Sequence, residues 1–164
     1  KNSLDEITGY LGVAKDITKE KEAELNLINS NKLLDESQSI AKTGSWKFDL
    51  ITKDLIWSKG HYRIFEIDEL PPDTLYEAYR NMLKPQDLLL LDKEIEKSVA
   101  TGQDFEFFNR IEFPDKRVKY ILTLGKVIKN EAGEIIGAQG SIQDITEKTL
   151  VEQSLINSNK LFKY

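Results

Sequence analysis

The sequence lacks cysteine entirely and contains a single histidine, His61. Without cysteine there is no disulfide, no thiolate nucleophile and no sulfur-ligated zinc or iron–sulfur site. With one histidine, a histidine pair for zinc cannot exist, and any Ser/His/Asp triad would have to include His61. We therefore predict no catalytic residues and no metal site in this chain.

Long hydrophobic runs are also missing. The longest, Leu88–Leu91, is far shorter than the roughly 18–20 residues of a membrane-spanning helix. The sequence starts at Lys1 without an initiator methionine or a signal-peptide pattern, which we interpret as a segment of a longer protein. We expect a cytoplasmic location and no direct membrane contact in this segment; anchoring of the parent protein in a membrane stays open.

The charge pattern gives no sign of a nucleic-acid partner. Acidic residues number 28 and basic residues 23, for a net charge of −5. The lysines and arginines are spread along the chain and do not form a basic stripe, so binding to nucleic acid is disfavoured. A hydrophobic content of 40% is enough for one domain core.

An internal repeat organises the chain. Residues 6–12 resemble residues 134–140, and at the same spacing Asp-Ile-Thr recurs at 16–18 and 144–146. Residues 28–33 and 156–161 share an identical hexamer, Ile-Asn-Ser-Asn-Lys-Leu. Repeats at one fixed spacing indicate tandem duplication of a module.

The repeat suggests four segments. Residues 1–17 are interpreted as the C-terminal strand remnant of a preceding domain, and 18–42 as a helical linker. One domain follows at 43–146, and 147–164 is the C-terminal linker helix, the start of a coiled-coil connector. A strand at 6–17 would lack its own sheet, so we expect it to pair with another copy or to stay disordered.

Both linkers carry a weak heptad pattern, which favours homodimers formed through the linker helices. Its apolar positions are Ala23, Leu27, Leu34 and Ala41 in the first linker, and Val151, Leu155 and Phe162 in the second.

Between the linkers, hydrophobic periodicity and turn residues predict an α+β domain. Strands are expected at 45–51, 55–58, 105–113, 118–129 and 135–145, with short helices at 59–65 and 75–83. A longer helix is expected to open at Pro85 and to end just before Gly102. Gly44 is expected to stop the first linker helix.

The order of these elements resembles a PAS domain, and so do several motifs. Thr43-Gly44-Ser45-Trp46-Lys47-Phe48-Asp49 resembles the family's first strand, and Leu55-Ile56-Trp57-Ser58 its second. Residues 107–111 are similar to the third strand, and residues 133–146, with the Asp-Ile-Thr ending, to the final hairpin. Lys84-Pro85-Gln86-Asp87 departs from the His-Pro-x-Asp stretch common before the longest helix.

The resemblance implies a PAS fold, a five-stranded antiparallel sheet with short helices on one face, flanked by N- and C-terminal linker helices. It also implies a cavity between sheet and helices in some members. Aromatic residues at strand spacing more often form plain core, but the candidates to line such a cavity are Trp46, Phe48, Trp57, Phe65, Phe105, Phe107 and Tyr120.

No cofactor is expected. The flavin-adduct subgroup of the family needs a cysteine, and there is none. Haem-binding relatives place the iron ligand on the long helix, here Leu88–Ala100, which has no histidine. We therefore expect His61 to be an ordinary surface or pocket-edge residue.

Signal transfer is expected at the Asp-Ile-Thr junction, which could equally be a purely structural joint between strand and helix. By resemblance, Asp144 would bond a basic or backbone partner on the sheet and Thr146 would cap the exit helix; Asp16 and Thr18 repeat this one module earlier. The resemblance implies a non-catalytic sensory, signal-transmission and dimerisation module of a multidomain protein such as a histidine kinase. Its partners would be the adjacent PAS and output domains of the same chain. The alternative is a PAS domain that binds a small molecule within a cyclic-dinucleotide enzyme or another receptor.

Overall fold

The computed structural model describes residue 12 and residues 14–163. Contacts divide the chain inside its first helix, α1 (Thr18–Ala41), into one unit that ends at Leu34 and a second that starts at Asp35. The strand predicted within residues 1–17 lies largely outside the described residues. Residue 12 and residues 14–17 belong to neither helix nor strand.

Helix α1 buries none of its residues. Leu27 and Leu34, of the predicted heptad seam, are 62% and 56% exposed. The helix ends before Lys42, which adopts a left-handed conformation with φ of 52°. The expectation that Gly44 stops this helix is therefore wrong. Gly44 already lies in the first strand, where a Cβ atom would overlap the backbone of His61.

Five antiparallel strands form one sheet in the order β2-β1-β5-β4-β3. This confirms the fold predicted from the sequence. The strands are β1 (Thr43–Asp49), β2 (Leu55–Trp57), β3 (Phe105–Glu112), β4 (Val118–Lys129) and β5 (Ile135–Asp144). Alternate residues of β3 are buried, as a strand with one covered face requires.

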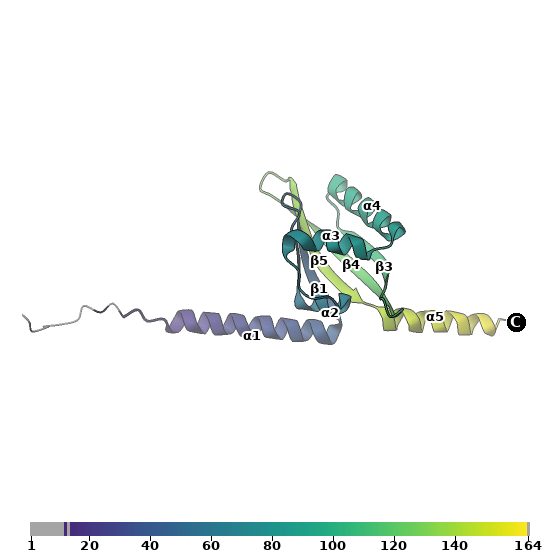
Figure 1. Cartoon of the computed structure of the whole chain (residues 1–164), viewed down its shortest axis with the longest axis horizontal. Helices are drawn as coiled ribbons and strands as arrows, with labels where there is room; N and C mark the ends of the chain where they lie inside the picture. Colours follow the sequence, from purple (N-terminus) through teal and green to yellow (C-terminus); the bar gives the residue numbers. More distant parts are fainter. Residues whose placement is uncertain (1–11, 13, 164) are drawn as a thin grey trace, which may run out of the picture. The chain divides into compact units, whose positions relative to one another are not determined.

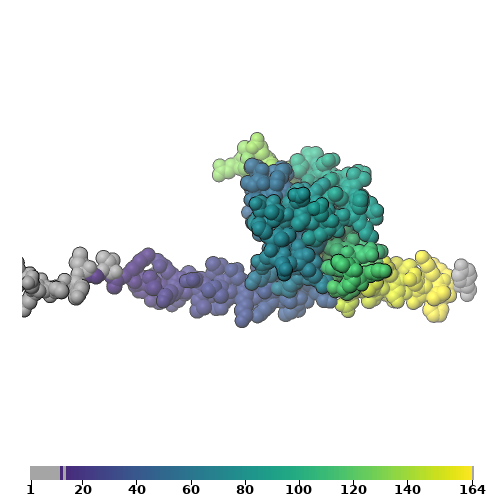
Figure 2. Space-filling model, viewed as in Figure 1, coloured from purple at the N-terminus to yellow at the C-terminus, as the bar shows by residue number. Residues whose placement is uncertain are grey.

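Three helices cover the buried face of the sheet (Figures 1 and 2): α2 (Lys59–Phe65), α3 (Pro72–Met82) and α4 (Pro85–Thr101). Proline opens both α3 and α4, where its missing N–H costs nothing. Gly102, with φ of 68°, ends α4. The core lies between the two layers and includes Leu75 of α3, Ile121 of β4 and Ile142 of β5.

The last helix, α5 (Thr146–Leu161), follows β5 after one residue and leaves the sheet (Figure 1). Like α1, it buries none of its residues. None of the helices within the described residues has the length and apolar character to span a bilayer.

Candidate functional site

A cavity of about 80 Å³ lies between the sheet and the helices. Aromatic side chains line it, and they come from β1, β2, α2 and the start of β3. Of the seven side chains predicted to line a cavity, the structure brings five together: Trp46, Phe48, Trp57, Phe65 and Phe105.

The other two predicted lining residues lie elsewhere. Phe107 faces the helices, but it packs under α4 with Leu83 and Leu91. Tyr120 does not line the cavity; its ring stacks against Phe108, which is 51% exposed, with 6.2 Å between the ring centroids. Tyr120 therefore belongs to the outer face of the sheet.

Helices α3 and α4 supply lining residues that the sequence did not single out, among them Tyr76, Tyr79 and Ile95. The sequence pattern predicts the helices that carry them, but it does not tell which turn of each helix faces the cavity. Among the described residues, the ionisable groups that line the cavity are His61 and the two tyrosines, and no carboxylate, lysine or arginine lines it. Burial raises the pKa of Tyr79, which keeps its phenol neutral.

His61 is only 3% exposed, so it is not a surface residue, but it does line the cavity, in agreement with a position at the pocket. Its ring stacks on Trp57, with 3.9 Å between centroids and 11° between planes. Burial lowers the pKa of His61 from 6.5 to about 3. A hydrogen bond with the Ser45 backbone raises this pKa, but its effect is smaller than that of burial. The Ser45 carbonyl also accepts a hydrogen bond from the Ser58 amide at 2.9 Å, and no other group among the described residues is a partner of the His61 ring nitrogens.

The junction between β5 and α5 is a compact group of hydrogen bonds. The Ile145 amide donates to the Tyr120 carbonyl at 2.9 Å, and the Tyr120 amide donates to the Thr146 hydroxyl at 3.0 Å. The Asp144 carboxylate accepts from the Thr146 amide at 3.0 Å and also from the Thr146 hydroxyl. These bonds tie the first residue of the exit helix to the first part of β4.

The two residues of this junction have exchanged their expected roles. Thr146, and not Asp144, bonds the sheet, and Asp144, and not Thr146, satisfies a free amide at the helix start. The repeated motif has the same local geometry: the Thr18 amide donates to the Asp16 carboxylate at 2.9 Å. The hydrogen bonds from Thr18 hold the pKa of Asp16 below its usual value.

Helix α2 is tied to the last turns of α1. The Ser58 hydroxyl, at the N-terminus of α2, donates to the Gln38 side chain at 2.8 Å. Arg63 donates to the Asp35 carboxylate at 2.8 Å and to the Asp35 carbonyl at 3.0 Å. The helix that carries His61 is therefore held by the end of the incoming helix.

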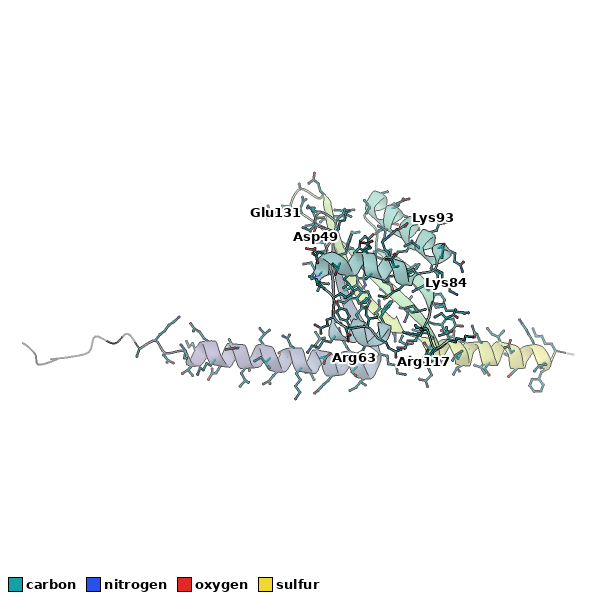
Figure 3. The ribbon with its side chains drawn as sticks, viewed as in Figure 1. Asp49, Arg63, Lys84, Lys93, Arg117 and Glu131 are labelled. Carbon is teal, nitrogen blue, oxygen red and sulfur yellow. The ribbon has the colours of Figure 1, made fainter. Side chains whose placement is uncertain are left out.

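The other end of α2 is tied to the start of β4. Arg117 donates two hydrogen bonds to the Glu66 carboxylate, at 2.9 and 3.1 Å, and Lys119 donates to the Ile64 carbonyl at 2.7 Å. Arg117 also lowers the pKa of Glu66. Figure 3 shows Arg63 and Arg117 at the same end of the domain as the start of α5. Lys119 directly precedes Tyr120, which holds the junction.

The described residues contain no group of three or more His, Cys, Asp or Glu side chains placed to hold a metal ion.

Comparison with known proteins agrees with this architecture. The family model described as the PAS fold matches residues 54–142, more than half of the chain. A methyl sulfide methyltransferase-associated sensor of Methanosarcina acetivorans is 28% identical over 87 residues, which cover 52% of this chain. Sensor protein FixL of Bradyrhizobium diazoefficiens is 27% identical over 112 residues, or 68% of this chain. The matches span only 9% and 22% of these two relatives.

The fold also matches solved structures. A sensory box histidine kinase/response regulator from Burkholderia thailandensis superimposes with a TM-score of 0.62 at 19% identity. The match covers 79% of this chain and 97% of that one.

Proposed function

The chain belongs to the PAS family, and from this membership we propose that it transmits a signal between its two linker helices within a larger signalling protein such as a histidine kinase. The observation that carries the proposal is the continuous set of polar contacts from the end of α1, through α2, to the start of α5. A change in the position of α1 is passed to α2 by Asp35 and Gln38. From Glu66, the residue just after α2, it is passed to the β4 segment beside Tyr120.

The contacts at the ends of α2 are weak enough to rearrange in a switch. Exposed charge pairs such as Asp35–Arg63 contribute roughly 0.2–1 kcal/mol each. A ligand or neighbouring domain can shift a two-state equilibrium of this size with a modest difference in affinity for the two states. The buried core beneath α2 is far more stable, so the contacts at its ends rearrange before the fold does.

The test is whether a substitution on α1 changes amide hydrogen exchange at the start of α5. Asp35→Asn weakens the contact between α1 and α2, and we expect about two- to five-fold faster amide hydrogen exchange at Tyr120 and at residues 146–150. Asp68→Asn, an exposed aspartate in the loop after α2, is the matched control. Equal exchange at these amides in both variants would refute transmission through α2.

We further propose that the linker helices pair with those of a second copy. All their described apolar side chains are exposed in the single chain, and Leu27 and Leu34 lie on the predicted seam at heptad spacing. Sedimentation equilibrium tests this: Leu27→Glu is expected to weaken the dimer, whereas Ile28→Glu, which removes an equally exposed side chain off the seam, is not. A chain that stays monomeric at high concentration would contradict the proposal.

A second candidate function is binding of a small molecule in the cavity. The specific observation in its favour is a cavity of about 80 Å³ whose lining is largely aromatic and aliphatic and includes the buried His61.

A further inference from the structure

One long edge of the sheet has no partner strand. The sheet order β2-β1-β5-β4-β3 puts β2 and β3 at its two edges. Strand β2 has only three residues, whereas β3 has eight, and the ladder between β3 and β4 runs from Phe105 to Glu112 without a bulge. Natural edge strands are usually short, bulged or protected by lysine or proline, and β3 has none of these features. Strand β3 is therefore open to pairing with a further strand.

The register of β3 shows which of its backbone groups are free. Tyr120 of β4 uses both its amide and its carbonyl on the side of β5 and the exit helix, through Thr146 and Ile145. Opposite residues of an antiparallel pair either exchange both bonds or point both groups apart, so Arg110, opposite Tyr120, points its amide and carbonyl to the edge. By the two-residue period of a strand, Phe108 does the same. Helix α4 packs on the inner face of β3, and no other described element bonds these edge groups.

The side chains of the same residues form a self-complementary pattern. Glu106, Phe108 and Arg110 point to the outer face, where Phe108 is 51% exposed and the Arg110 side chain 50%. When two copies of β3 lie antiparallel with Phe108 opposite itself, Glu106 of each copy faces Arg110 of the other. Two opposite-charge pairs then flank one pair of aromatic rings, and both kinds of cross-strand pair stabilise a sheet. Within one chain the Arg110 guanidinium lies 3.6 Å from the Glu112 carboxylate, a long and exposed contact that it can exchange.

The neighbouring registers lack this complementarity. Two copies of the edge can shift only in steps of two residues, because the free backbone groups recur at that spacing. A step in one direction places Glu106 opposite Glu112, and like charges directly opposite are destabilising. A step in the other direction places Glu106 opposite Phe108 and takes Arg110 past the start of the partner strand. Charge therefore selects the register that is centred on Phe108.

We propose that β3 pairs antiparallel with β3 of a second copy, centred on Phe108, so that the two five-stranded sheets join into one. The partner is a second copy because the charges of β3 complement those of the same strand read in the opposite direction. A surface that pairs with itself closes at two copies, so both free edges are used and no fibre grows. The contact uses no residue of the linker helices and is independent of the linker pairing proposed above.

The absence of cysteine allows the contact to be located by crosslinking. Opposite residues that exchange both backbone bonds lie about 5.5 Å apart at Cα, within the range of a disulfide. Phe108→Cys is therefore expected to form a crosslinked dimer under a mild oxidant such as diamide. Leu124→Cys, on the outer face of the neighbouring β4 and 45% exposed, is the matched control and is expected to stay uncrosslinked. Both variants are made in a chain that also carries Leu27→Glu and Leu155→Glu, which are directed against the linker pairing.

Charge reversal in the same chain tests the register. Arg110→Glu places two like-charge pairs in the contact, and the dimer dissociation constant from sedimentation equilibrium is expected to rise by at least about ten-fold. Lys47→Glu changes the net charge equally on β1, away from this edge, and is expected to leave the constant unchanged. The double variant Glu106→Arg, Arg110→Glu restores the opposite-charge pairs and is expected to recover the original constant to within about three-fold.

The remaining outcomes separate this contact from the linker pairing. A Phe108→Cys crosslink in the chain with both linker substitutions supports the β3 contact whether or not the linkers pair. Loss of all association in that chain would leave the linker pairing standing and overturn the β3 contact. Equal crosslinking of Phe108→Cys and Leu124→Cys would also overturn it. A double variant that associates no more tightly than Arg110→Glu alone would refute the register, and with it the choice of a second copy as the partner.

Discussion

The stability of this domain is expected to fall between pH 7 and pH 5 because of one residue. Burial lowers the pKa of His61 in the folded chain to about 3, whereas the unfolded chain regains the ordinary value of 6.5. Below pH 6.5 the unfolded state therefore binds a proton that the folded state does not. Folding loses about 1.4 kcal/mol per pH unit through that window, down to the folded pKa.

Between pH 7 and pH 5 the loss amounts to about 2 kcal/mol, because the first half unit lies above the unfolded pKa. This is a large fraction of the roughly 5–15 kcal/mol that stabilise a typical domain. The chain has no other histidine, so no second imidazole contributes. Carboxylates with a lowered pKa, such as Glu66 and Asp92, also stabilise the fold. Their stabilisation is lost at lower pH, as the pH falls through their folded pKa values.

Urea unfolding at pH 7, 6 and 5, at one fixed protein concentration, measures the effect. His61→Phe removes the titrating group and is expected to flatten the profile over this window. The difference between the two proteins cancels every contribution that they share. Parallel profiles for the two proteins would show that His61 takes up its proton while folded, and would refute the buried, neutral state.

Two further predictions concern close contacts. Thr146→Val removes the acceptor of the partly buried Tyr120 amide and is expected to speed hydrogen exchange of that amide by about ten-fold. Thr149→Val, on the same helix, is expected to leave that rate unchanged, and similar rates in both variants would contradict the junction described above. Gly44→Ala is expected to lower the free energy of unfolding in urea by about 1–3 kcal/mol, because the new Cβ has no room. At Gly12 nothing lies within 4 Å of such an atom, so Gly12→Ala should change stability by less than about 0.5 kcal/mol, and equal effects at both glycines would refute the steric argument.

The sequence predicted the sheet well because strand alternation is a local property. In β3, Phe107, Asn109 and Ile111 all face the helices, as their spacing of two indicates. The side assigned to Tyr120 in β4 was wrong because that strand has apolar residues on both faces. Leu122 and Leu124 share the outer face with Tyr120, while Thr123 on the inner face looks polar, so alternation could not distinguish the two sides.

The details of the site depended on contacts that no local pattern reports. Phe107 was assigned to the correct face, but the packing of α4 determines whether a residue on that face touches the cavity. The roles of Asp144 and Thr146 depend on which group β4 presents to them, a matter of register between strands. His61 is buried because Trp57 of the neighbouring strand covers its ring.

The chain enters and leaves this domain at almost the same point. β1 and β5 are neighbours in the sheet, and the Asp144 amide donates to the carbonyl of Lys42, the residue just before β1, at 2.9 Å. A unit whose two ends lie this close together can be inserted into another chain without moving the flanking segments apart. Adding such a unit therefore requires no redesign of what lies on either side.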